Sequence, residues 1–75
     1  MIDKNLETGD SGADVINLQK YLEKKGFLTM PQGVSEGYFG LLTKKALIVF
    51  QRVADIPATG YCGTITRGII NVGGE

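Results

Sequence analysis

The stretch Gly37-Tyr38-Phe39-Gly40-Leu41-Leu42-Thr43 is the middle copy of a motif, Gly-x-x-Gly-x-x-(Val or Thr), that occurs three times in the chain. The other two copies span residues 9–15 and 60–66. Glycine costs backbone entropy inside a helix, so a glycine pair ahead of an apolar periodic run is typical of a turn that leads into a helix. The repetition therefore indicates internal duplication of one supersecondary unit.

The segment that follows the first copy is predicted to be helical over residues 12–25, because apolar residues recur there three and four positions apart. Ser11-x-x-Asp14 resembles a capping box at the start of this helix, and Gly26 can supply a left-handed C-cap at its end. The apolar residues of the stripe are Val15, Leu18 and Leu22.

Two further helices are predicted after the other copies, over residues 41–53 and 64–71. One face of the second helix is expected to be buried, and its members are Leu42, Ala46, Val49, Phe50 and Val53. The third helix carries Ile65, Ile69 and Ile70. Leu6 is expected to fold back onto the core, and one ring of the Tyr38-Phe39 pair is expected to fill it. The prediction is an all-α fold, a small three-helix bundle with an internal pseudo-repeat, in one domain over residues 1–75 with its core at about 6–71.

Composition limits the possible partners. Eight Lys and Arg residues balance eight Asp and Glu residues, so the chain has no net field to attract nucleic acid or an anionic membrane. No segment approaches the roughly 20 apolar residues of a membrane span, and the first five residues lack the organisation of a secretory signal. With one cysteine and no histidine, the chain cannot be stabilised by an internal disulfide, and a structural metal site is not expected. We therefore expect helix packing to stabilise the fold, and we expect a monomer without a cofactor.

Most catalytic chemistries lack a necessary part. Without histidine there is no Ser-His or Cys-His pair, and the acidic residues lie where a helix surface, a cap or a turn explains them. Cys62 takes the position that Phe39 has in the previous copy, which favours a small buried apolar residue over a reactive thiol. The glycine pairs lack the lysine of a phosphate-binding loop. The chain is therefore predicted not to be an enzyme.

Gln19 and Gln51 each follow an apolar residue that faces the core, which places each amide at the edge of the buried surface. Two interpretations are open. The amides either bond the backbone of a nearby loop and fix that loop to the helix, or they contact a ligand. We favour the first.

Taken together, the motifs resemble the type-1 family of bacterial peptidoglycan-binding domains. The pattern that carries the resemblance is Leu6-x-x-Gly9-x-x-Gly12-x-Asp14-Val15-x-x-Leu18-Gln19-x-x-Leu22-x-x-x-Gly26, then Gly37-x-Phe39-Gly40-x-x-Thr43-x-x-Ala46-x-x-x-Phe50-Gln51, then Thr59-Gly60 and Thr66. The resemblance implies a three-helix bundle and a noncatalytic module that binds peptidoglycan, both glycan strand and stem peptide, and targets a fused or associated cell-wall hydrolase. It also implies an extracytoplasmic location, in the cell wall or periplasm.

A receptor for a glycan-peptide strand should combine aromatic faces with amide and hydroxyl groups. The repeat positions suggest that the loop before the second helix is the best place for this groove, with an arginine available to a stem-peptide carboxylate. Its expected residues are Tyr38, Thr43 and Gln51 on one wall and Tyr61, Thr66 and Arg67 on the other. The two threonines could instead cap helices.

Two other functions stay open. The chain could be a helical protein-interaction or structural domain that kept the fold and lost glycan binding. It could also be a small nucleic-acid binder that uses Lys44, Lys45 and Arg52, although the zero net charge argues against this.

Overall fold

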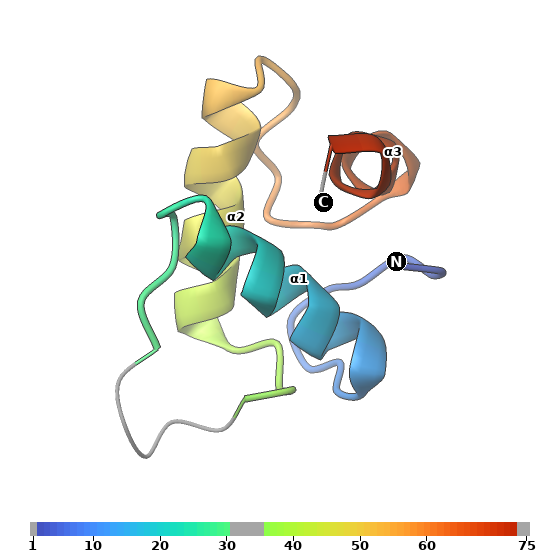
Figure 1. Ribbon diagram of the computed structural model, residues 1–75, viewed down its shortest axis with the longest axis vertical. Coiled ribbons are helices and arrows are strands. Elements are labelled where there is room, and N and C mark those ends of the chain that lie inside the picture. The colour runs from blue at the N-terminus through green and yellow to red at the C-terminus, as the bar shows by residue number, and fades with distance from the viewer. Residues whose placement is uncertain (1, 31–35, 74–75) are drawn as a thin grey trace.

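The computed structural model describes residues 2–30 and 36–73, and within these ranges it contains three helices and no strand. They are α1 (Ala13–Lys24), α2 (Leu41–Val53) and α3 (Thr64–Gly73). Each begins directly after the second glycine of a motif copy, as the repeat predicts. The expected all-α three-helix fold is confirmed, and α1 lies across α2 while α3 is seen end-on beside them (Figure 1).

The core forms where α1 and α2 cross. Phe50 of α2 makes edge-to-face contacts with Tyr21 and with Phe27, at centroid distances of 5.5 and 5.7 Å. Phe39 and Leu6 are fully buried, as expected, and Tyr38 is 49% exposed, so Phe39 is the ring of the pair that fills the core. The buried apolar residues are Ile2, Leu6, Val15, Leu18, Tyr21, Leu22, Leu28, Phe39, Ala46, Leu47, Phe50, Cys62 and Ile70.

The buried face of α2 differs from the prediction. Leu42, Val49 and Val53 are exposed at 42%, 46% and 69%. The inner face consists of Thr43, Ala46, Leu47, Phe50 and Gln51. The helix turns a different face to the core than predicted because Thr43 and Gln51 find hydrogen-bond partners inside the fold. These bonds offset the cost of burying the two polar side chains. Ile65 of α3 is likewise 63% exposed, whereas Ile70 is buried.

The start of α1 is also built differently from the prediction. Gly12 is the N-cap residue and no side chain in the described ranges caps the helix there, so the capping box of Ser11 and Asp14 was wrong. Asp14 Oδ2 instead accepts a hydrogen bond from the Asp3 backbone N–H at 3.1 Å. The prediction failed because a capping box needs Ser11 at the N-cap, and the helix begins one residue later. At the other end, Gly26 has φ +85°, as a left-handed C-cap requires.

A segment before α1, residues 2–6, fastens α3 to the rest of the molecule; we call it the N-terminal arm. Leu6 and Cys62 exchange two backbone hydrogen bonds, of 3.0 and 2.8 Å. The side-chain amide of Asn71 accepts from the Ile2 N–H and donates to the Ile2 carbonyl, both at 2.9 Å. Ile2 is 1% exposed, so this arm contributes to the core although its sequence is mostly polar.

Candidate functional site

Two glutamines make matching sets of hydrogen bonds, which we call the amide clamps. In the first clamp, Gln19 of α1 accepts from the Gly37 N–H at 2.7 Å through Oε1. Its Nε2 donates to the Tyr38 carbonyl and to Thr43 Oγ1, both at 3.0 Å. One helix thereby fixes the turn that begins the next.

The second clamp repeats this geometry one copy later. Gln51 of α2 accepts from the Gly60 N–H at 2.9 Å, and its Nε2 donates to the Tyr61 carbonyl at 2.9 Å and to Thr66 Oγ1 at 3.2 Å. Gln19 is 0% exposed and Gln51 is 1% exposed. The interpretation that these amides bond a loop backbone is therefore confirmed, and the Nε2 group of each one already serves two acceptors.

The clamps also explain why glycine begins the second and third copies. Gly37 and Gly60 have φ +91° and +77°, a region that other residues rarely adopt. A Cβ on Gly60 would lie 2.9 Å from Lys44 Cγ, and one on Gly37 would lie 3.2 Å from Ile16 Cγ1. Both the turn and the close packing against the previous helix therefore need glycine.

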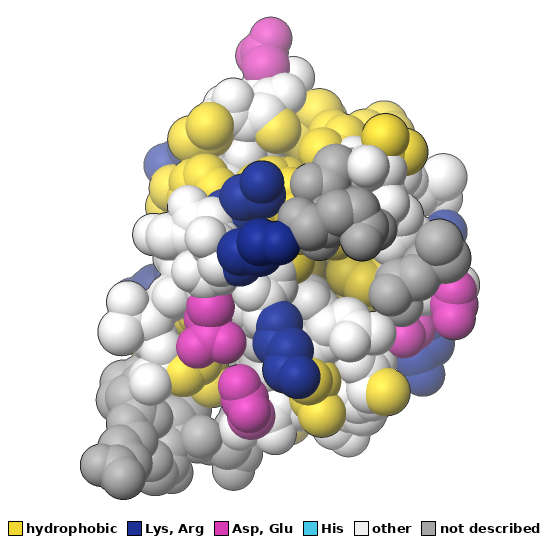
Figure 2. Space-filling view, viewed as in Figure 1, with side chains coloured by type: hydrophobic (Ala, Val, Ile, Leu, Met, Phe, Trp, Pro, Cys, Tyr) yellow, Lys and Arg dark blue, Asp and Glu magenta, His cyan; other side chains and the backbone are white. Residues whose placement is uncertain are grey.

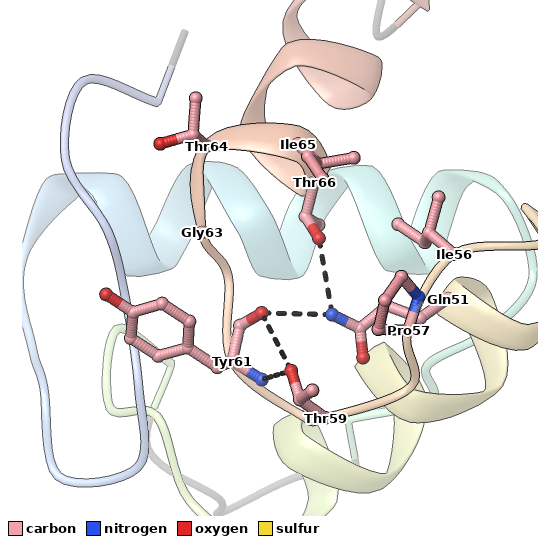
Figure 3. Close-up of a pocket in the computed structure, with 9 residues that line it drawn as sticks. All are labelled: Gln51, Ile56, Pro57, Thr59, Tyr61, Gly63, Thr64, Ile65 and Thr66. Carbon is pink, nitrogen blue, oxygen red and sulfur yellow. Dashed lines mark hydrogen bonds between the residues drawn. The ribbon is translucent and has the colours of Figure 1, made fainter.

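A pocket of about 250 Å³ opens beside the second clamp, where the loop after α2 turns into α3 (Figure 3). Ile56 and Pro57 lie on one side, and Ile65 and Thr66 lie on the other. The described residues that line it are Gln51, Ile56, Pro57, Thr59, Tyr61, Gly63, Thr64, Ile65 and Thr66. The Tyr61 ring points away from Ile56 and Pro57 in this view. The clamp bonds Gln51 to the loop at Gly60 and Tyr61, and this loop forms one side of the pocket.

The structure brings together three of the six residues expected to bind a ligand. Gln51, Tyr61 and Thr66 line the pocket, whereas Tyr38 and Thr43 belong to the first clamp. Thr43 and Thr66 are buried and accept hydrogen bonds from the glutamines, which is neither a helix cap nor an open ligand contact.

The sixth residue, Arg67, is held by the N-terminal arm. Its Nε donates to Asn5 Oδ1 at 2.9 Å, and Nη1 donates to the Asp3 carbonyl at 3.3 Å. Sequence reasoning missed Ile56, Pro57, Thr59 and Ile65. Hydrophobicity alone does not distinguish a residue of the core, such as Ile70, from one at the rim of a pocket, such as Ile65.

The face in Figure 2 shows Lys and Arg side chains among Asp and Glu side chains. Within residues 2–30 and 36–73, no group of three metal-binding side chains occurs, and no helix is long and apolar enough to cross a membrane.

Cys62 is the buried thiol that the repeat predicts, with 0% exposure. Burial raises the pKa of the Cys62 thiol from 9.0 to about 11, and the positive charge of Arg67 opposes this shift. At pH 8 an alkylating reagent should therefore react at least about 100-fold more slowly with the folded chain than with the chain in urea, because the thiolate is the nucleophile. Equal rates in the two conditions would contradict the burial.

The same shift predicts how stability depends on pH. Below pH 9.0 the thiol is protonated in both folded and unfolded chains, so it has no effect. As the pH rises from 9.0 to about 11, the unfolded chain releases a proton that the folded chain retains, and stability falls. Urea denaturation at pH 8 and 10, with Cys62→Ala as the control, measures this loss.

Comparisons with known proteins agree with this architecture. The chain is 44% identical over 55 residues to the N-acetylmuramoyl-L-alanine amidase CwlM of Mycobacterium tuberculosis, covering 73% of this chain and 13% of that protein. It is 38% identical over 65 residues to the spore cortex-lytic enzyme of Bacillus cereus, covering 87% of this chain and 24% of that protein. The chain thus spans less than a quarter of the length of these relatives.

Solved structures resemble it over most of its length. The crystal structure of the SleB N-terminal domain has a TM-score of 0.88 and 33% sequence identity, with 100% of both chains covered. The Burkholderia AP3 phage endolysin has a TM-score of 0.79 and 31% identity over 95% of this chain and 26% of that one. A family model described as "Putative peptidoglycan binding domain" matches residues 11–70. The chain therefore belongs to this peptidoglycan-binding domain family.

Proposed function

We propose that residues 1–75 form a single noncatalytic domain that binds peptidoglycan and holds an attached or partner cell-wall hydrolase at the wall, outside the cytoplasm. Family membership and the names of the relatives support the ligand and the partner. A weak binding module raises the effective concentration of a linked enzyme near an insoluble polymer. The module itself need do no chemistry.

The observation that carries the proposal is the pocket beside the second clamp. It presents the apolar side chains of Ile56, Pro57 and Ile65 to solvent, and Ile65 in the first turn of α3 is 63% exposed. Exposed apolar groups around a shaped depression are typical of a ligand contact surface. We place the wall contact there and assign to Gln51 and Thr66 the role of holding the pocket in shape.

The pseudo-repeat supplies a matched pair of variants to test this surface. Ile65 and Leu42 occupy the same position of their motif copies, are both exposed, and lie second in α3 and α2. An aspartate at either position is favoured by the helix dipole, so stability should change little. We expect Ile65→Asp to lower the amount of protein that sediments with purified sacculi by about tenfold or more, since it loses apolar contact worth about 1.5 kcal/mol. Leu42→Asp should bind within about twofold of the wild type.

Two outcomes would contradict the proposal. Wild-type protein that stays in the supernatant at moderate salt would refute wall binding and would support the protein-interaction alternative. Equal losses for Ile65→Asp and Leu42→Asp would show that the pocket is not the distinct contact surface. Circular dichroism of each variant controls for folding.

A further inference from the structure

We infer that the pocket binds the uncharged face of an acetamido sugar in the glycan strand and does not bind the charged groups of the stem peptides. This inference rests on the proposed function and specifies which part of the polymer is recognised. Three features of the pocket support it.

The first feature is the absence of charge. None of the nine lining residues that the structure describes is an Asp, Glu, Lys or Arg. A carboxylate or an ammonium group placed among Ile56, Pro57 and Ile65 would lose hydration without gaining a side chain of opposite charge, which is unfavourable. The chemistry of the lining selects a neutral group.

The second feature is that the polar groups at the turn beside the pocket are already in use. Both bonds from Gln51 Nε2 go to acceptors within the fold, and the Gly60 N–H is taken by Gln51 Oε1. The Tyr61 N–H donates to Thr59 Oγ1 at 3.1 Å. These donors cannot rearrange around an incoming anion without breaking the clamp. These donors of the turn are therefore not available to a ligand.

The third feature is the position of Arg67, the cation expected to meet a stem-peptide carboxylate. It is bonded to Asn5 and to the Asp3 carbonyl, and its Nη2 reaches Thr64 Oγ1 at 3.4 Å. These bonds fasten the N-terminal arm. A carboxylate that captured the guanidinium would have to displace them.

An acetamido sugar has the complementary chemistry. Its ring presents C–H groups and its acetamido group ends in a methyl, which suit Ile56, Pro57 and Ile65. Its hydroxyls can reach the exposed Thr64 at the rim. A volume of about 250 Å³ lies below the range of roughly 300 to 1,000 Å³ that holds a drug-sized ligand, so one sugar residue occupies the pocket.

The test is competition for sacculi between two soluble probes, a neutral tetramer of N-acetylglucosamine and a free stem pentapeptide. We expect the tetramer to release the wild-type protein from sacculi and the pentapeptide at equal concentration to release none. Raising NaCl from about 50 to 500 mM should change the bound fraction by less than about twofold, since no charge pair is formed. Release by the pentapeptide alone, or a tenfold loss of binding with salt, would overturn the inference.

The location is tested separately by NMR with the same tetramer. Addition of the tetramer should shift the backbone amide signals of Ile56, Ile65 and Thr66 in the wild-type protein and in Leu42→Asp. In Ile65→Asp the signals of Ile56 and Thr66 should stay unchanged. Shifts confined to other regions would overturn the inference. If sacculi retain the protein but the tetramer neither competes nor shifts these amides, this inference fails and the proposed function stands. If sacculi do not retain the protein, the proposed function fails.

Discussion

Gln51→Met is expected to lower the free energy of unfolding by about 2–4 kcal/mol and to abolish binding to sacculi. Methionine matches glutamine in length, so the packing volume is kept while the three hydrogen bonds are lost. The buried Gly60 N–H is left without its acceptor. A 75-residue domain has only about 4–11 kcal/mol of stability in total, so urea denaturation should show a large shift of the midpoint.

Gln19→Met is the matched control, because the first clamp has the same geometry. It should cost about the same stability, roughly 2–4 kcal/mol, yet leave the pocket beside the second clamp intact. Binding is compared at a temperature where both variants give folded spectra. Loss of binding in both variants would mean that binding follows overall stability and not the pocket. Unchanged stability in either would show that its clamp contributes little.

Phe39→Ala is expected to lower the free energy of unfolding by about 3–5 kcal/mol and to leave much of the protein unfolded at 37 °C. Phe39 is fully buried, and its backbone also bridges the first and second copies through hydrogen bonds with Gly9 and Asp10, of 2.9 and 2.8 Å. The cavity left by the ring cannot close because these backbone bonds hold the chain in place. Thermal denaturation followed by circular dichroism measures the effect.

Two other substitutions provide a comparison for the loss of stability in Phe39→Ala. Tyr38→Ala removes a ring that is 49% exposed and should cost about 1 kcal/mol or less. Cys62→Ala removes one buried sulfur at the equivalent position of the third copy and should cost about 1 kcal/mol. If Phe39→Ala were no worse than Tyr38→Ala, the burial of the ring would not matter to stability. Phe39→Leu, which refills part of the space, should recover more than half of the loss.

Several parts of the fold could be predicted because they depend on neighbours in the chain. The spacing of apolar residues located α1, α2 and α3 to within about two residues, and the glycine pairs marked where each begins. The amides of Gln19 and Gln51 were assigned to loop backbones from their place beside core residues. The burial of Cys62 followed from its alignment with Phe39.

Other parts could not be predicted because their partners are distant. Ile2 stands alone in a polar segment, and its partner Asn71 lies 69 positions further along the chain. Asp14 was assigned to a local cap, yet it bonds Asp3, eleven positions away. The exposed side of α2 carries Val49 and Val53, which hydrophobicity alone would place inside.

The amino-acid sequence by itself determined the three helices, the repeated glycine turns and the family resemblance, because these are written in local spacing and backbone preference. Only the tertiary structure decided which face of α2 is buried, which of the six expected ligand residues meet, and that a neutral pocket lies beside Gln51. The physical reason is that a polar side chain enters a core only where the rest of the fold supplies its hydrogen bonds. For Gln51 those partners come from the turn before α3, and the same bonds give the pocket its shape.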